Sequence, residues 1–206
     1  QWASITLSVN FNMQWTARVF HHLVRLPLGW FDARSKGSIN ARFEAVDTIQ
    51  EALTTQVLEV ARFSPSWKNT QPVRYIVIDD PALKERMARE CIPGQGFNTK
   101  TINRAAALAV IAYVPGLSGQ GDAPLTESQA AGWEMFDAGI AAQTFCLAAR
   151  DLGIGTCILG IFDAGAAGRL LELEGLRPAC LIAMGYPEQW KNGPGRKETE
   201  ELLSFR

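Results

Sequence analysis

The feature that most constrains this chain is a polar connection between an amphipathic helix and an apolar strand. It reads VLEVARFSPSWKNTQP over Val57–Pro72, and the apolar run Val73–Ile78 follows directly. Loops that join a helix to a strand often carry small-molecule sites, because a rigid scaffold positions them. Prolines restrict this loop, and its polar side chains are Ser64, Ser66, Lys68, Asn69, Thr70 and Gln71. An ordinary helix–strand connection is the alternative interpretation.

Length and composition predict one globular domain with a sizeable core. The chain has 206 residues, of which 47% are hydrophobic and 20% are charged, a balance typical of folded proteins. Its formal net charge of -1 favours neither nucleic acid nor an anionic membrane as a partner. The longest apolar run, Ala105–Val114, is shorter than the roughly 18 residues that a membrane span needs. We therefore expect no nucleic-acid partner and no membrane partner.

The cysteines predict free thiols rather than a metal site. None of them forms a CxxC pair, and the only histidines, His21 and His22, lie far away in the sequence. A zinc site is therefore not expected. Free, mostly buried thiols indicate a reducing compartment, which predicts a cytoplasmic protein. The four cysteines are Cys91, Cys146, Cys157 and Cys180.

Downstream of the loop, apolar runs alternate with helical segments. The runs that predict buried strands are Val73–Ile78, Ala107–Val114 and Ala179–Tyr186. The predicted helices are Pro81–Glu90, with Pro at its first turn, the long Trp133–Leu152 and the short Phe162–Leu173. Residues 115–132 are rich in Gly, Ser, Pro and Gln, which predicts a mobile loop that covers a site.

Three further segments have plain structural interpretations. Asn98 and Thr99 suit the N-cap of a short helix. The run GIGTCILG, Gly153–Gly160, suits a helix end followed by a turn and a strand. It is a poor phosphate loop, because it holds no Lys and no helix N-terminus follows at once. Arg196 and Lys197, taken alone, are a solvated surface pair.

In their order along the chain, these segments resemble the nitroreductase family of FMN-dependent oxidoreductases. The resemblance covers about residues 57–206 and rests on the SPSWKN loop, the Asn before the second strand, GIGTCILG, and the ending GYPEQWKNGPGRKETEELLSFR. It implies an α+β fold, with a mixed, mainly antiparallel sheet of four or five strands flanked by helices. It also implies an obligate homodimer with FMN at the subunit interface.

The resemblance also implies which residues hold the FMN. Asn98 would touch the edge of the flavin ring, and Arg196 and Lys197 would bind the phosphate through strong charge-assisted contacts. The loop would contribute Pro65, Ser66, Trp67 and Asn69. The backbone N–H groups that would face the ring, one of them near flavin N5, belong to Ile158, Leu159 and Gly160.

Two positions depart from the family pattern. A Lys often stands three residues after the Asn that touches the flavin, whereas this chain has Thr101 there and Lys100 beside it. The family also normally has a basic stretch ahead of the loop, and counting back from Pro65 reaches Gly37–Ala41, with only Arg42 basic close by. Losing two phosphate contacts of about 1.5–3 kcal/mol each would weaken FMN binding by a few orders of magnitude.

The mechanism that the resemblance implies relies on the flavin rather than on side chains. NAD(P)H delivers hydride to flavin N5 and leaves, and an acceptor then binds in the same place, which is a ping-pong cycle. Candidate acceptors are nitroaromatics, quinones and enones, and either NADH or NADPH fits as the donor. No catalytic side chain is therefore assigned. The alternative is a cofactor-free or inactive protein of this fold that has lost its N-terminal phosphate-binding arm.

The first 56 residues have a different character. The stretch HHLVRLPLGWFDARSKGSINARFEAVDTIQEALTTQ resembles a helix and cytoplasmic loop from the membrane domain of bacteriocin-type ABC exporters. The chain has no Walker-type GxxxxGK[ST] motif, so ATP hydrolysis is not expected. We expect an exporter-like helical segment at 1–56 and a nitroreductase-like FMN-binding domain at 57–206. A natural fusion, an engineered chimera and a mis-joined fragment all fit this pattern.

Overall fold

The structure is a computed structural model that describes residues 56–94, 96–120, 126–187, 189–190 and 193–206. The exporter-like segment expected at 1–56 lies outside these residues, apart from Gln56. A helical turn at residues 56–61 leads into the polar loop that precedes the first strand. Val57 and Ala61 of this turn are fully buried in the core.

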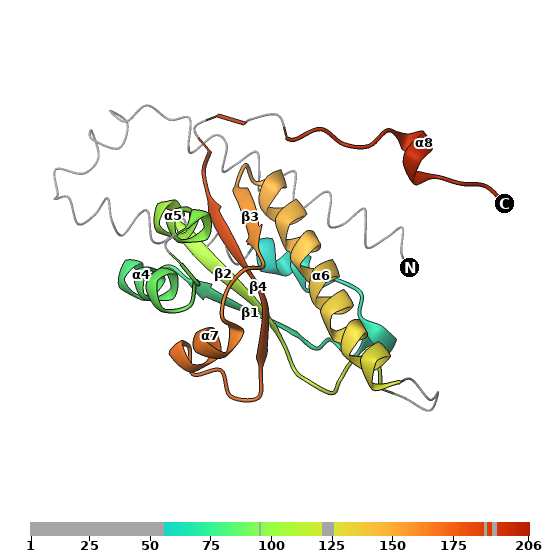
Figure 1. The fold of residues 1–206 in the computed structure, drawn as a ribbon, viewed down its shortest axis with the longest axis horizontal. Coiled ribbons are helices and arrows are strands. Elements are labelled where there is room, and N and C mark those ends of the chain that lie inside the picture. Colours follow the sequence, from blue (N-terminus) through green and yellow to red (C-terminus); the bar gives the residue numbers. More distant parts are fainter. Residues whose placement is uncertain (1–55, 95, 121–125, 188, 191–192) are drawn as a thin grey trace.

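A four-stranded sheet forms the centre of the protein (Figure 1). From one edge to the other, its strands are β1 (Val73–Ile78), β2 (Ala107–Tyr113), β4 (Arg177–Gly185) and β3 (Gly155–Leu159). Each neighbouring pair is antiparallel. The expected α+β fold with a mainly antiparallel sheet of four or five strands is thus confirmed.

Helices cover both faces of the sheet, as Figure 1 shows. The helices are α4 (Pro81–Glu90), α5 (Phe97–Arg104), α6 (Glu127–Asp151), α7 (Ala164–Leu170) and the short α8 (Thr199–Leu202). Side chains of β2 alternate between two cores because successive strand residues point to opposite faces. Ile111 packs with Phe145 of α6, whereas Leu108 packs with Met87 of α4 and Ile102 of α5. This two-sided burial explains why β2 is apolar along its whole length.

Capping residues set where the helices begin. Asp80 accepts hydrogen bonds from Ala82 N and Leu83 N, and it starts α4 with Pro81 in the first turn. Thr126 and Gln129 form a capping box that starts α6 at Glu127. The expectation of a loop over 115–132 was therefore wrong for residues 127–132, which are helical. Asp163 caps α7, which is shorter than the helix expected over Phe162–Leu173.

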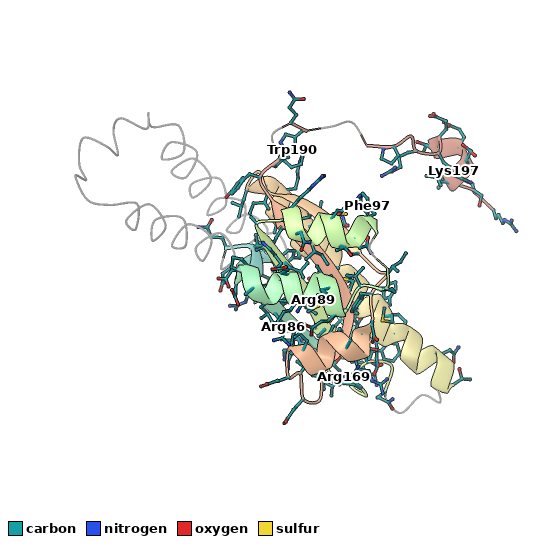
Figure 2. The ribbon with its side chains drawn as sticks, turned by 60° about the vertical axis from the view of Figure 1, so that its left-hand side comes forward. Arg86, Arg89, Phe97, Arg169, Trp190 and Lys197 are labelled. Atoms are coloured by element: carbon teal, nitrogen blue, oxygen red, sulfur yellow. The ribbon has the colours of Figure 1, made fainter. Side chains whose placement is uncertain are left out.

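The C-terminal tail leaves the sheet beside the end of α6. The guanidinium carbon of Arg150, Cζ, lies 3.2 Å from the centroid of the Trp190 ring. This is a cation–π contact. Beyond Trp190 the tail and α8 project away from the sheet in both views (Figures 1 and 2). The described part of the chain holds no helix of the length and apolar character that crossing a membrane requires.

Candidate functional site

The polar loop before β1 has an unusual backbone. Its centre is a single 3₁₀ turn, η1 (Trp67–Asn69). Lys68, Asn69 and Gln71 have positive φ angles of 46°, 57° and 50°, a region that residues other than glycine rarely adopt. Each such residue costs about 1–3 kcal/mol and persists only where the surroundings impose it, as they often do at functional sites. This conformation favours a functional loop over an ordinary helix–strand connection.

Hydrogen bonds within the loop hold part of this shape. Ser66 Oγ accepts a hydrogen bond from Gln71 N at 2.8 Å, which closes the turn around η1. The Gln71 side-chain amide donates to Asn69 Oδ1 at 3.3 Å. Arg74 Nη1 donates to Gln71 O at 2.9 Å. The predicted residues Ser66 and Asn69 therefore belong to one ordered turn. Because Asn69 Oδ1 accepts from Gln71, the orientation of the Asn69 NH₂ group is also defined.

A buried carboxylate on α6 holds the rest of the loop conformation in place. Asp137, which is 1% exposed, accepts from Trp67 N at 3.2 Å and 3.0 Å through its two oxygens. Ser118 Oγ donates to the same carboxylate at 2.5 Å. The Trp67 indole Nε1 donates to Gln120 O at 2.9 Å, and its ring lies 4.7 Å from that of Trp133. Trp67 is thus fixed through its backbone, its indole N–H and its ring.

Sequence reasoning missed Asp137. Asp137 lies three residues after Glu134, the spacing that brings two side chains to one face of a helix. Both carboxylates are buried, and Glu134 accepts from Gly116 N at 2.5 Å. Two acids at helical spacing in an otherwise alanine-rich helix were the available signal. It was not used, because their partners lie in segments distant along the chain.

A cavity of about 440 Å³ lies beside the loop. The loop residues that line it include Pro65, Ser66 and Thr70, and Asp137 reaches it from α6. Thr70 Oγ1 is a buried oxygen that has no hydrogen-bond partner among the described residues. Because buried polar atoms are nearly always paired, this hydroxyl suits a polar ligand. The cationic side chains in the lining are Arg62 and Arg74.

Tyr75 also lines this cavity. Its hydroxyl donates to Ala61 O at 3.1 Å, and Ser64 Oγ donates to the same carbonyl at 2.6 Å. Burial raises the pKa of Tyr75, and the hydrogen bond with Ser64 partly opposes this shift. Tyr75 is therefore a neutral hydrogen-bonding group at pH 7.

A second group of predicted residues meets at α5 and the end of β3. Gly96, not Asn98, is the N-cap of α5, so the N-cap interpretation of Asn98 was wrong. The Asn98 Nδ2 instead donates to Ile161 O at 3.0 Å, across 63 residues of sequence. Ile158 and Ile161 are largely exposed beside this contact, and Phe97 is exposed at the start of α5 (Figure 2).

The predicted residues Ile158, Leu159 and Gly160 lie at the end of β3. β3 is an edge strand whose neighbour in the described sheet is β4 alone, and an edge strand leaves some N–H and C=O groups unpaired within its sheet. Leu159 is buried, and open space surrounds the position that a Cβ of Gly160 would take. Asn98 therefore lies beside Ile161, the residue that follows the run 158–160.

Within one chain, the loop and the C-terminal end of α5 lie at opposite ends of β2, whereas the end of β3 is level with the middle of β2, because Leu159 pairs with Leu181 and Leu181 pairs with Val110. The loop leads into Val73, which pairs with Tyr113 at the end of β2. Asn98 lies in α5, which leads into Ala107 at the start of β2 (Figure 1). Because β2 has seven residues, the two ends are roughly 20 Å apart at about 3.4 Å per residue. A single chain does not bring the predicted residues into one site.

The predicted phosphate-binding pair lies in a third place. Arg196 Nη1 donates to its neighbours Pro194 O and Gly195 O at 2.9 Å and 3.3 Å. Lys197 Nζ lies 4.0 Å from Glu201, on the tail that projects from the sheet (Figure 2). Neither side chain contacts the loop or α5 in this chain. The stretch Gly37–Ala41 and Arg42 lie outside the described residues.

The departure at Thr101 has a local explanation. Thr101 Oγ1 donates to Phe97 O at 2.9 Å within its own helix, so its hydroxyl serves α5 rather than a ligand. Lys100, the next residue back, is exposed. The described residues nevertheless fit a flavin mononucleotide in their donor chemistry. They supply neutral donors for the ring, the unpaired Thr70 hydroxyl, and cations for the phosphate.

Comparison with known proteins identifies the family of this chain. The nitroreductase family model matches residues 35–186, which is most of the chain. The chain belongs to the nitroreductase family. An oxygen-insensitive NADPH nitroreductase of Helicobacter pylori is 26% identical over 179 residues, covering 73% of this chain and 83% of that protein.

Solved structures show the same nitroreductase fold. A nitroreductase family protein from Streptococcus pneumoniae superposes with a TM-score of 0.67 at 21% identity, covering 75% of this chain and 89% of that chain. A protein from Desulfovibrio desulfuricans, described as a nitroreductase and solved in complex with FMN, gives a TM-score of 0.59 at 25% identity. That match covers 75% of this chain and 84% of the other.

The N-terminal part matches a different family. The model of the ABC transporter transmembrane region matches residues 1–63. The colicin V secretion/processing ATP-binding protein of Escherichia coli is 42% identical over 57 residues, which cover 28% of this chain and 8% of that protein. The resemblance to exporters is thus confirmed. The two family matches overlap over residues 35–63, and the boundary predicted between residues 56 and 57 lies within this overlap.

Proposed function

We propose that this protein is an FMN-dependent oxidoreductase that passes reducing equivalents from NAD(P)H to a small organic acceptor. One observation carries the proposal: the hydrogen bond from Asn98 to Ile161 O places Asn98 beside the run Ile158–Gly160, so two segments that the resemblance assigns to the flavin lie together. Their plain structural interpretations, an N-cap and a simple turn, predict no contact between them. Family membership and the FMN complex of the Desulfovibrio relative support the same cofactor.

The residues of this chain would bind and orient the cofactor. Asn98 and the backbone at Ile158–Gly160 would receive the polar edge of the ring, while Ser66 and Asn69 would contact it from the loop. Arg196 and Lys197 would hold the phosphate. When bound, FMN supplies a carrier that takes hydride at N5 and returns electrons to an acceptor. The nearby apolar side chains would exclude water from that face of the ring.

The substrates we propose follow from this carrier. NAD(P)H and the acceptor would use the same face in turn, a ping-pong cycle that requires no acid–base side chain. Nitroaromatics, quinones and enones are the acceptors that fit an exposed apolar surface. The exposed aromatic nearest to Asn98 is Phe97, which we assign to this acceptor surface together with Trp67.

We propose that the working unit is a homodimer in which each site draws on both chains. Within one chain the loop lies at one end of β2 and α5, which carries Asn98, leads into the other end, which supports a site completed by a second copy. α6 presents large exposed apolar side chains on its outer face, at Met135, Phe136 and Leu147, and such exposure marks interaction surfaces. A second copy on this face would bury them.

The remaining assignments concern the compartment and the N-terminus. The four cysteines are free thiols in the described chain, which supports our proposal of a reducing, cytoplasmic compartment. We propose that residues 1–56 are an exporter-like helical segment joined to a domain that begins near residue 57. Because the nitroreductase family match begins at residue 35, we place the junction no nearer the N-terminus than that residue.

The experiment is a flavin titration followed by gel filtration. Purified protein is mixed with FMN, passed through the column, and scanned for absorbance bands at about 370 and 450 nm, the usual bands of an oxidised flavin. We expect both bands to elute with protein at the dimer volume and to bleach when NADPH or NADH is added without oxygen. Riboflavin, which lacks the phosphate, is the matched control and should be retained less.

Two results would contradict the proposal. Protein that emerges colourless at FMN concentrations of tens of micromolar would favour the alternative, a cofactor-free protein of this fold. Equal retention of riboflavin and FMN would remove the role given to Arg196 and Lys197 while leaving the flavin assignment intact.

A further inference from the structure

We infer that Asp137 is a positioning residue that sets the conformation of the flavin-binding loop from α6. The inference rests on the proposed function for the identity of the ligand. Asp137 has no part in the family resemblance drawn from the sequence. It touches the loop through Trp67 N rather than through a side chain that would contact a ligand.

The geometry places Asp137 at the junction of three segments. Its carboxylate lies on α6. It accepts hydrogen bonds from Trp67 N of the loop and from Ser118 Oγ of the 115–120 segment. Trp67 Nε1 donates to Gln120 O, so the loop and the 115–120 segment are also joined directly. A change at Asp137 therefore releases two segments together.

The burial of this carboxylate indicates a strong constraint. Asp137 is 1% exposed, and the donors that the structure gives it are neutral groups. A buried charge is tolerated only when its hydrogen bonds are well made. Its oxygens therefore hold Trp67 N and Ser118 Oγ in place, since movement of either would leave the charge unsatisfied.

The constraint acts where the backbone is least stable by itself. Trp67 is followed by Lys68 and Asn69, both with positive φ angles. Fixing Trp67 N at one side and closing Gln71 N onto Ser66 Oγ at the other defines both ends of this strained stretch. Asn69, a proposed flavin contact, lies between these two anchors. Removing the first anchor lets the strained residues relax and moves Asn69.

Glu134 provides a matched control on the same helix. It is also buried and also accepts a backbone N–H, that of Gly116 at 2.5 Å, but it has no hydrogen bond to the loop. Asp137→Ala and Glu134→Ala each remove one buried carboxylate from α6. Asp137→Asn is the rescue variant, because its amide oxygen can accept from Trp67 N while its NH₂ donates to a rotated Ser118 hydroxyl.

The test measures FMN affinity and loop structure separately. We expect Asp137→Ala to raise the FMN Kd about tenfold or more, because the loop amide loses its acceptor. Asp137→Asn and Glu134→Ala should stay within about threefold of wild type. Near-UV circular dichroism of the protein without FMN should lose the Trp67–Trp133 signal in Asp137→Ala alone, with Trp67→Phe used to assign that signal.

The outcomes separate this inference from the proposed function. A wild-type protein that fails to bind FMN contradicts the function, whereas the dichroism signal still tests the positioning. Asp137→Ala with unchanged Kd and unchanged dichroism overturns the inference, and so does an Asn variant as weak as the Ala variant. If Asp137→Ala does not fold, Asp137→Leu replaces it, because leucine fills the space but gives Trp67 N no acceptor. An unchanged FMN Kd and dichroism in Asp137→Leu would then overturn the inference.

Discussion

At the scale of single residues, burial decides which polar groups matter, and burial depends on the fold. Asn98 was singled out from its position in the sequence, but neither the flavin interpretation nor the N-cap interpretation gave its partner, Ile161 O. Asp137 looked like any acid on a helix until the structure showed it 1% exposed against Trp67 and Ser118. Residue type alone thus identifies candidates but does not give their contacts.

Cys180 leads to a prediction about pH. Burial, and to a lesser extent the nearby Cys146 thiol, raise the pKa of Cys180 to about 11 from an ordinary value of 9.0. The unfolded chain therefore releases this proton first, and the folded protein holds more protons between pH 9 and 11. Stability should fall as pH rises through this window, by up to about 3 kcal/mol from this group.

Cys180→Ala should flatten that loss. Urea unfolding of both proteins at pH 7, 9, 10 and 11 gives the comparison. The variant is expected to start less stable at pH 7, because a buried side chain is shortened, but to lose less stability by pH 11. Parallel stability curves for the two proteins would refute the assignment.

At the scale of elements, local signals set helix starts better than they set helix ends or loops. Asp80 with Pro81 gave the start of α4 at the predicted residue. The capping box of Thr126 and Gln129 was overlooked in a segment rich in loop-forming residues, so α6 was expected to begin at Trp133 rather than Glu127. Composition favoured a loop over residues 127–132, but the specific cap determined the outcome.

Lys84 links two elements and supports a stability prediction. This buried lysine of α4 donates from Nζ to Ala105 O at 2.5 Å and to Ala106 O at 3.2 Å, just after α5 ends. Lys84→Met should destabilise the protein by about 1–3 kcal/mol, because these carbonyls lose their donor. Lys100→Met, at an exposed position of α5, is the control and should change stability by less than about 0.5 kcal/mol.

Thermal or urea unfolding of the two variants decides this prediction. A loss in Lys84→Met no larger than that in Lys100→Met would show that the two carbonyls find water instead. Burial lowers the pKa of Lys84, so the folded protein favours its neutral form more than the unfolded chain does. Its contribution to stability should therefore rise as pH approaches 10.5, a trend that Lys84→Met would remove.

At the scale of the whole molecule, the proposed homodimer with shared sites leads to a prediction. The loop leads into β1 beside the end of β2, whereas α5, which carries Asn98, leads into the start of β2. In a homodimer with shared sites, each site takes the loop of one chain and Asn98 of the other. A loop variant and an Asn98 variant would then damage different halves of each site.

Mixing two such variants should restore binding. Asn69→Ala and Asn98→Ala are each expected to bind FMN weakly as pure dimers. A mixed dimer has one site with both changes and one site with neither, so random pairing should restore about one quarter of the wild-type sites. FMN titration of co-expressed variants measures this fraction. No recovery in verified mixed dimers would show that each site is built from one chain.

The sequence by itself determined the elements and their type. Periodicity, caps and apolar runs are local, so β1 was predicted at Val73–Ile78 with its observed bounds and α4 at Pro81–Glu90. Only the tertiary structure decided which segments meet, because strand order and burial depend on contacts far apart in sequence. It brought Asn98 to Ile161 and Trp67 to Asp137, and it placed the loop and the C-terminal end of α5 at opposite ends of β2.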